Sequence, residues 1–339
     1  MSENHPTPEW AKLLPEGEFI SYLPSYVGGK YFDLFDKFTF PCEETGAITY
    51  YVYDPVKQGA DPSGKYPVLL WLHGATNGLN GTFCICNCGG ELFASPEYQA
   101  AMGGNTDVAA VAPKAQQDVA QPRATGGAYI VVPLANEKMD DNGKLAETFS
   151  EKYFEPLKGI VERVREGGGT DAAAVAPKAQ QDAAQPRATG GNAGKVFAMG
   201  GSLGGWMTWK MAEEFPEMFG GIIPISTSYI PTDEQLENIA RHRIAVYFTL
   251  GRHDETLDFD KDIAPRIPKM EELGFTCFFP EWVKNGDGGV ASLFYGWEMG
   301  QHCMINQVQA NLMYDDGTPY DPRLPNGVCG WIKAVVDCK

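Results

Sequence analysis

The sequence has few basic residues and no long apolar run. Its 339 residues include 27 lysines and arginines against 44 aspartates and glutamates, which gives a formal net charge of −17. An acidic surface repels phosphate backbones and anionic lipids, so we expect no nucleic-acid partner and no membrane partner. No stretch approaches the roughly 18 consecutive apolar residues that indicate a membrane-spanning helix.

Cysteines are also few, with eight in the whole chain, which is too sparse for a small domain held together by disulfides. The first ten residues, MSENHPTPEW, contain neither the basic stretch nor the apolar stretch of a secretory signal. We therefore expect a cytoplasmic protein with reduced thiols. The alternative is a secreted protein whose signal peptide is not part of this sequence.

An internal repeat is present in two nearly identical copies. Residues 106–127 read TDVAAVAPKAQQDVAQPRATGG and residues 170–191 read TDAAAVAPKAQQDAAQPRATGG. Solenoid repeats recur three or more times and diverge, so this pair is not an architectural repeat. Both copies are rich in Ala, Gln, Pro and Gly and contain no aromatic residue, which leaves little to bury. We interpret them as inserted loops; the alternative is a pair of docking peptides.

With these two copies set aside, strand-like and helix-like patterns alternate along the chain, which predicts an α/β fold with a mostly parallel central sheet and helices on both faces. Apolar runs typical of buried parallel strands are followed by runs with helical periodicity. Residues 35–40 and 47–53 are more polar and predict an antiparallel hairpin at one edge. The predicted parallel strands are 66–73, 129–135, 195–199, 221–225, 244–250 and 276–280, and the predicted helices are 91–102, 145–165, 203–215, 232–243, 263–273 and 303–314.

The predicted domain organisation is an N-terminal extension, residues 1–34, followed by one catalytic domain, residues 35–339. Both repeat copies fall where a helix leads into the next strand. Ligands of such sheets bind at the opposite edge, outside the carboxyl ends of the strands. We therefore expect the inserted loops to lie far from the functional site.

A serine motif follows the predicted strand 195–199. The residues Gly-Gly-Ser-Leu-Gly at 200–204 match G-x-S-x-G, and a helical pattern follows at once. Small flanking residues permit the strained turn that exposes a serine above the sheet, and the next N–H points at the site from a helix N-terminus. Ser202 is therefore the candidate nucleophile. A chance match in a chain with 39 glycines is the alternative.

A nucleophilic serine needs a general base, and the chain has only five histidines. His5 lies in a polar tail, His242 lies between two arginines, and His73 ends a predicted strand. His253 directly precedes an aspartate. His302, near the start of a predicted helix, is the candidate base.

The group that orients this histidine is expected after the strand 244–250. Asp254 follows that strand directly, and the order Ser202, Asp254, His302 is the order of the α/β-hydrolase triad. Asp254 is the candidate acid; Glu255, Asp258 and Asp260 remain alternatives.

The oxyanion of an acyl-transfer intermediate needs preorganised donors. Leu203 N–H is one candidate, and the loop HGATNG at 73–78 supplies the second, for which we select Ala75. Within this loop His73 is interpreted as a structural residue. No metal site is predicted, since the cysteines of CICNC (Cys84, Cys86 and Cys88) lack the spacing and the second pair of a zinc site. They could line the acyl pocket or simply pack in a loop.

The segments WLHGATNG, GGSLGG, GRHDE and GQHC, in this order, resemble α/β-hydrolase esterases, in particular feruloyl esterases, polyhydroxybutyrate-depolymerase-like esterases and acetyl esterases. The resemblance implies a serine carboxylic-ester hydrolase that needs no cofactor. Some tannase and feruloyl esterase relatives join a cysteine before the serine to one after the histidine. Here Cys303 follows His302, but Gly201 precedes Ser202, so that bridge cannot form.

We therefore expect hydrolysis through an acyl-enzyme of aryl, feruloyl or short-acyl esters, including carbohydrate-linked ones. Serine peptidase, thioesterase and non-catalytic binding protein are the alternatives. Thr76, Trp206, Trp282 and Trp297 are candidate substrate-binding residues, although aromatic residues more often belong to a core, as we expect for Trp209.

Overall fold

The computed structural model describes residues 19–20, 29–75, 77–79, 85, 90–103, 127–166, 193–284, 289–291 and 300–338. Its main element is an eight-stranded sheet in the order β11-β10-β9-β8-β4-β5-β3-β2. All neighbours are parallel except β2 with β3 and β3 with β5. The strands are β2 (Phe35–Phe40), β3 (Ile48–Tyr53), β4 (Tyr66–Leu72), β5 (Tyr129–Pro133), β8 (Ala193–Gly201), β9 (Phe219–Ile225), β10 (Ala245–Thr249) and β11 (Thr276–Phe278).

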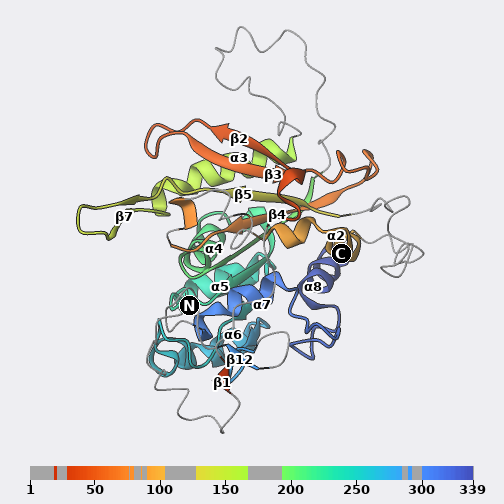
Figure 1. The fold of residues 1–339 in the computed structure, drawn as a ribbon. Helices are drawn as coiled ribbons and strands as arrows, with labels where there is room; N and C mark the ends of the chain where they lie inside the picture. The colour runs from red at the N-terminus through yellow and green to blue at the C-terminus, as the bar shows by residue number, and fades with distance from the viewer. Residues whose placement is uncertain are drawn as a thin grey trace, which may run out of the picture.

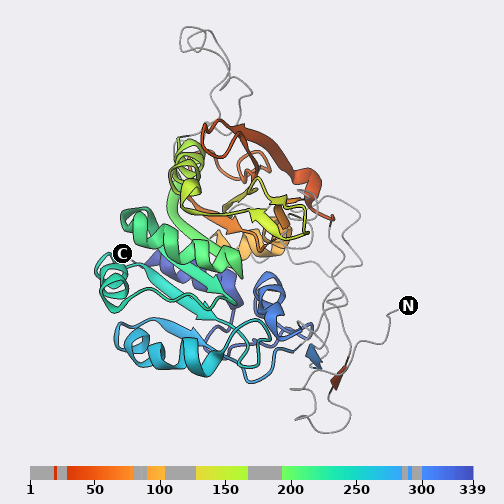
Figure 2. The ribbon, with the colours of Figure 1, turned by 90° about the vertical axis from the view of Figure 1, so that its left-hand side faces the viewer.

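The burial of each strand follows its sequence. All seven residues of β4, YPVLLWL, are buried, as a central parallel strand covered on both faces requires. The edge strand β2, FDKFTF, has no fully buried residue, and its Lys37 and Thr39 are exposed. The predicted parallel sheet and the antiparallel edge hairpin are both confirmed. Figure 2 shows the sheet twisting from β2 and β3, in red, toward the cyan and blue end of the chain.

Helices cover both faces of this sheet and create two cores. In β4, Val68, Leu70 and Leu72 belong to one core, and Leu69 and Trp71 to the other. The first core includes residues of α3, α4, α5 and α6, and the second includes residues of α2, α7 and α8. Figure 1 shows α2 beside α8. The helices are α2 (Pro96–Met102), α3 (Phe154–Arg165), α4 (Leu203–Glu214), α5 (Asp233–Arg241), α6 (Ile267–Glu272), α7 (Met304–Gln309) and α8 (Gly327–Asp337).

The strand order reverses between β4 and β8. From β4 the chain passes through α2 to β5 on one side, whereas from β8 it passes through α4 to β9 on the other. The two crossover helices pack on opposite faces, so the loops after β4 and β8 separate at the carboxyl edge of the sheet. Such a switch point is where open α/β sheets bind ligands.

Four predicted helices differ from the observed ones. The predicted helix 91–102 begins only at Pro96, because residues 91–94 form a 3₁₀ turn and Ser95 is the N-cap of α2. The predicted helix 145–165 begins only at Phe154, because 145–147 form β7 (Leu145–Glu147), which pairs with β6 (Lys138–Met139) across a turn at Gly143. The predicted helix 303–314 stops at Gln309, since Asn311 and Leu312 adopt positive φ angles. The predicted helix 263–273 is shorter, because a π-helical turn, η11 (Phe259–Ile263), and a 3₁₀ turn, η12 (Ala264–Arg266), precede α6. Helix α8 was not predicted.

The two repeat copies lie outside the described residues, apart from Gly127. Along the chain, one copy lies between α2 and β5 and the other between α3 and β8. Both connections lead from a helix to the amino end of a strand, as the sequence indicates.

Part of the predicted N-terminal extension contacts the rest of the chain. Strand β1 (Phe19–Ile20) pairs in parallel with β12 (Val290–Ala291). The backbone N–H groups of Gly29 and Tyr31 donate to the carboxylate of Glu91, in the 3₁₀ turn η4 (Glu91–Ala94). Among the described helices, none is both long enough and apolar enough to cross a membrane.

Candidate active site

Ser202 occupies a sharp turn between β8 and α4. Its backbone angles are φ 56° and ψ −117°, a conformation that costs a non-glycine residue about 1–3 kcal/mol. Ser202 N–H donates to Ile225 O at 2.9 Å, and its carbonyl accepts from Trp206 N–H at 3.0 Å. These bonds tie the turn to β9 and to the first turn of α4. The strained geometry is that of a nucleophile elbow.

The glycines around Ser202 allow α4 to lie directly against β4. A Cβ at Gly200 would lie 2.3 Å from Leu72 O, and one at Gly204 would lie 1.9 Å from the same atom. Any larger residue at these two positions would force β4 and α4 apart. The spacing of the G-x-S-x-G motif thus reflects backbone contact as well as the turn itself.

His302 lies in the 3₁₀ turn η13 (Gln301–Cys303) that begins α7, and its ring contacts Asp254. The two Asp254 carboxylate oxygens lie 2.8 and 3.0 Å from His302 Nδ1. Thr256 donates to Asp254 Oδ1 with both its N–H (2.9 Å) and its hydroxyl (2.7 Å). The Thr256 hydroxyl also lies 2.9 Å from His302 Nδ1. Since the Asp254 side chain is fully buried, this arrangement fixes the ring and directs its Nδ1 proton to a carboxylate.

The three other acidic candidates occupy different positions. Asp258 accepts from Lys261 N–H at 3.1 Å at the start of the π-helical turn, and Asp260 is exposed. Glu255 accepts the backbone N–H groups of Gln301 and His302, each at 3.1 Å. Of these four carboxylates, Asp254 is the one that is hydrogen-bonded to the imidazole of His302.

The His302 segment crosses beside Ser202. Ser226, directly after the Ile225 that accepts from Ser202 N–H, donates its hydroxyl to His302 O at 2.9 Å. A Cβ built at Gly201 would lie 2.1 Å from Ile305 Cδ1, so α7 packs against the residue before the serine. Within the described structure no hydrogen bond joins Ser202 Oγ to His302 Nε2. In enzymes without substrate such catalytic hydrogen bonds are often long or poorly aligned.

The loop after β4 lies on the other side of Ser202. A Cβ at Gly74 would lie 3.7 Å from Ser202 Cβ and 3.5 Å from Gly201 O. Ala75 follows Gly74 and is exposed. Leu203 is the first residue of α4, so its N–H has no acceptor within the helix. The two candidate oxyanion donors therefore flank the serine; Thr76 lies outside the described residues.

His73 anchors this loop. Its Nδ1 lies 2.7 Å from Gly74 O, and its Nε2 accepts from Ala135 N–H at 3.0 Å. The ring packs on Phe149, with centroids 4.5 Å apart. Burial lowers the pKa of His73 to about 4. The geometry is that of a neutral structural histidine.

Sequence reasoning did not identify Glu137, a buried carboxylate that holds the same loop. Its Oε2 accepts from Gly78 N–H at 2.8 Å, and its Oε1 accepts from the Thr148 hydroxyl at 2.6 Å. Thr256 and Ser226 were also missed. Thr256 follows Asp254 by two residues, a spacing typical of side-chain turns that could have indicated its bond; no local pattern marks Glu137 or Ser226.

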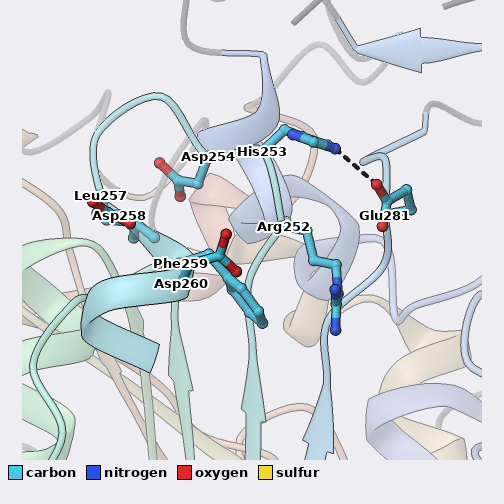
Figure 3. Close-up of a pocket in the computed structure, with 8 residues that line it drawn as sticks. All are labelled: Arg252, His253, Asp254, Leu257, Asp258, Phe259, Asp260 and Glu281. Atoms are coloured by element: carbon cyan, nitrogen blue, oxygen red, sulfur yellow. Dashed lines mark hydrogen bonds and ion pairs between the residues drawn. The ribbon is translucent and has the colours of Figure 1, made fainter. Parts of the chain in front are cut away.

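A hollow of about 560 Å³ lies beside Asp254 (Figure 3). The loop after β10 and Glu281 form its rim. His253 Nε2 points toward Glu281 and lies 2.8 Å from its Oε1. The Arg252 guanidinium lies 4.8 Å from the centre of the Phe259 ring. The lining is Arg252, His253, Asp254, Leu257, Asp258, Phe259, Asp260 and Glu281.

The aromatic residues that the sequence offered for substrate binding lie in different parts of the structure. Trp206 is half-buried and packs against the core on the α4 side of the sheet. Trp282 stacks on His253, with ring centroids 3.9 Å apart. Trp209 is fully buried and packs on Phe248, as expected for a core residue. Trp297 lies outside the described residues.

Several of the remaining histidines and cysteines lie outside the described residues. His242 is exposed at the end of α5, and His5 lies outside the described residues. Cys84, Cys86 and Cys88 also lie outside, although Ile85 between them is buried. The described part of the chain contains no group of three or more His, Cys, Asp or Glu side chains that could hold a metal ion.

No protein-family model matches the sequence, and no curated protein matches it. Solved structures are similar in fold. A thermostable esterase superposes with a TM-score of 0.53 at 20% identity, over 82% of this chain and 60% of that chain. The feruloyl esterase module from Clostridium thermocellum, in complex with sinapinate, gives a TM-score of 0.47 at 14% identity, over 87% of this chain and 91% of that module. This chain thus spans less than two thirds of the thermostable esterase. Together with the strand order and the turn at Ser202, the comparison shows that the chain has the α/β-hydrolase fold.

Proposed function

We propose that the protein is a serine carboxylic-ester hydrolase that acts through an acyl-enzyme. The observation that carries the proposal is the buried Asp254–His302 pair, 2.8 Å apart, held beside a serine with the strained backbone of a nucleophile elbow. A histidine whose Nδ1 is bound to a carboxylate presents its Nε2 as a general base. The activity of the thermostable esterase of similar fold agrees with this chemistry.

In the proposed reaction, Ser202 Oγ attacks the ester carbonyl carbon while His302 Nε2 takes the hydroxyl proton. The N–H groups of Ala75 and Leu203 stabilise the oxyanion. His302 then gives its proton to the departing alcohol, which leaves an ester between Ser202 and the acyl group. Water, deprotonated by His302, hydrolyses that ester. Asp254 orients the ring and stabilises the imidazolium, and no cofactor takes part.

For the substrate class we propose aryl, feruloyl or short-acyl esters, including esters linked to carbohydrate. Trp206, Trp282, Thr76 and Trp297 are proposed to contact the acyl or alcohol group. A peptide or thioester substrate would use the same nucleophile, base and oxyanion donors.

The test compares wild type with Ser202→Ala on aryl esters of graded acyl length, methyl hydroxycinnamates, a thioester and an aryl amide. Ser63→Ala, an exposed serine in the turn before β4, is the matched control. We expect Ser202→Ala to lose turnover by about 10⁴-fold or more and Ser63→Ala to keep it. A phosphonate reagent is expected to label wild type at Ser202.

Retention of turnover by Ser202→Ala would overturn the serine mechanism. Faster turnover of the amide or the thioester than of the oxygen esters would reassign the substrate class. A wild type inactive on the whole panel and unlabelled by the phosphonate would favour a binding role.

A further inference from the structure

The residue proposed as general base lies on a segment with little regular structure of its own. His302 is in a single 3₁₀ turn, and α7 after it has six residues. The first N–H groups of such a turn have no acceptor inside it. Other parts of the chain must therefore fix the height of the imidazole above Ser202.

Glu255 supplies the missing acceptors. Its Oε1 accepts from Gln301 N–H and its Oε2 from His302 N–H, both at 3.1 Å. The residue before it, Asp254, binds the ring of the same histidine. Two consecutive carboxylates after β10 thus hold His302 at its backbone and at its side chain.

A third contact completes the support. Ser226 donates its hydroxyl to His302 O at 2.9 Å from the loop after β9. The backbone N–H, the backbone carbonyl and the ring of His302 are each bound by a different side chain. Moreover, the Gln301 side chain bonds to Val283 and Ala291, which extends the support to the segments before and after residues 285–288.

An ionised carboxylate accepts at both positions and offers no competing donor. In a carboxamide or a protonated carboxyl, one of the two groups that face the N–H donors becomes a donor itself. Glu255 is half-buried, and burial raises its pKa to about 7, with the adjacent Asp254 charge acting in the same direction. The ionisable groups that face it in the described structure are Asp254 and, through its backbone, His302.

We propose that Glu255 is a positioning residue that holds the backbone of Gln301 and His302 so that the imidazole can reach Ser202. This inference rests on the proposed esterase function. Displacement of a catalytic group by about 1 Å can cost on the order of 10²-fold in rate. Loss of the hydrogen bonds from Gln301 N–H and His302 N–H to Glu255 should therefore lower kcat. KM should stay largely unchanged, because Glu255 is not placed to contact substrate.

The experiment measures kcat and KM for wild type, Glu255→Gln and Glu255→Asp between pH 5.5 and 8.5, with Glu234→Gln as the control. Glu234 is an exposed carboxylate on α5. At pH 8.5 we expect Glu255→Gln to lose about 10- to 100-fold in kcat with KM within about twofold. At pH 5.5 the difference in kcat between Glu255→Gln and wild type should narrow to about threefold, because the wild-type carboxyl is then largely protonated and its hydroxyl is a weaker acceptor.

Glu255→Asp keeps the negative charge but is one methylene shorter, so it cannot reach both N–H groups. A comparable loss of kcat at pH 8.5 would show that the hydrogen bonds matter rather than the charge. The thermal midpoint of each variant is measured in parallel, and rates are expressed per folded molecule. If Glu255→Gln does not fold, the result for Glu255→Asp decides.

The proposal is overturned if both variants keep kcat within twofold of wild type at pH 8.5. It is also overturned if the ratio of Glu255→Gln to wild type does not change with pH. Ser202→Ala in the same assay separates the two proposals. If Ser202→Ala is inactive and Glu255→Gln behaves as wild type, only the positioning role fails. If Ser202→Ala stays active, the serine mechanism fails.

Discussion

Two buried histidines lie beside the candidate nucleophile, one on each side. His73 follows β4, and His302 precedes α7. Both ring nitrogens of His73 are hydrogen-bonded to backbone atoms, those of Gly74 and Ala135. His302 Nδ1 is hydrogen-bonded to the carboxylate of Asp254, and no described residue forms a hydrogen bond with its Nε2. The partners of the ring, rather than burial, distinguish a structural histidine from one that can act as a base.

The electrostatic surroundings of the two rings differ in the same way. His73 has no carboxylate partner, so burial keeps it neutral and lowers its pKa to about 4. His302 lies on the buried carboxylate of Asp254, which can stabilise an imidazolium. One ring supports the loop that carries Ala75, and the other is arranged to exchange protons.

The largest loss of kcat is expected when the charge of Asp254 is removed. Asp254→Asn is expected to lower kcat about 10³-fold or more, because the amide no longer stabilises the imidazolium and no longer fixes the tautomer. Steady-state kinetics on an aryl ester measure the effect. Asp260→Asn, a change at an exposed aspartate of the following π-helical turn η11, should stay within about twofold of wild type. A loss smaller than tenfold in Asp254→Asn would contradict the assignment.

The complementary change is at the other ring. His73→Ala should destabilise the fold by about 2–4 kcal/mol, because it deletes a buried ring and leaves the Ala135 N–H without its acceptor. The kcat of the folded protein should fall by less than tenfold. Urea unfolding and initial rates measure the two quantities. His242→Ala, an exposed histidine, should change stability by no more than about 0.5 kcal/mol.

A greater effect of His73→Ala on kcat than on stability would contradict this comparison. It would mean that His73 takes part in the reaction, or that the loop conformation it supports limits the rate.

The smallest expected effect is a pH dependence of stability. The folded pKa of His73 lies below the ordinary value of 6.5, so its contribution is fully present above pH 6.5 and is lost as pH falls through about 4. The stability difference between wild type and His73→Ala should therefore shrink by about 1 kcal/mol between pH 7 and pH 5.5. Urea midpoints at the two pH values measure this stability difference. Glu255 contributes a pH dependence of stability of opposite sign, which is the same in both proteins and cancels in the difference. A constant difference would show that His73 is not held neutral by the fold.

The sequence predicted the sheet well because its signals are local. Buried strands such as β4 consist of contiguous apolar residues, and the glycines around Ser202 mark a strained turn within five residues. Helix α8 and the β6–β7 hairpin were missed. Strand β7 lies at the start of the predicted helix 145–165, and the two strands of the hairpin have only two and three residues. Periodicity cannot separate such short elements from the start of a helix.

The sequence by itself determined the alternation of strands and helices, the turn at Ser202 and the order of serine, aspartate and histidine. Tertiary structure alone decided which of four neighbouring carboxylates meets the ring, since Asp254 and His302 are 48 residues apart. It also decided that Glu255 binds the His302 backbone, 47 residues away, and that His73 is bound to Ala135, 62 residues away. The physical reason is that such contacts depend on which strand ends the sheet order brings together, and no local pattern encodes that order.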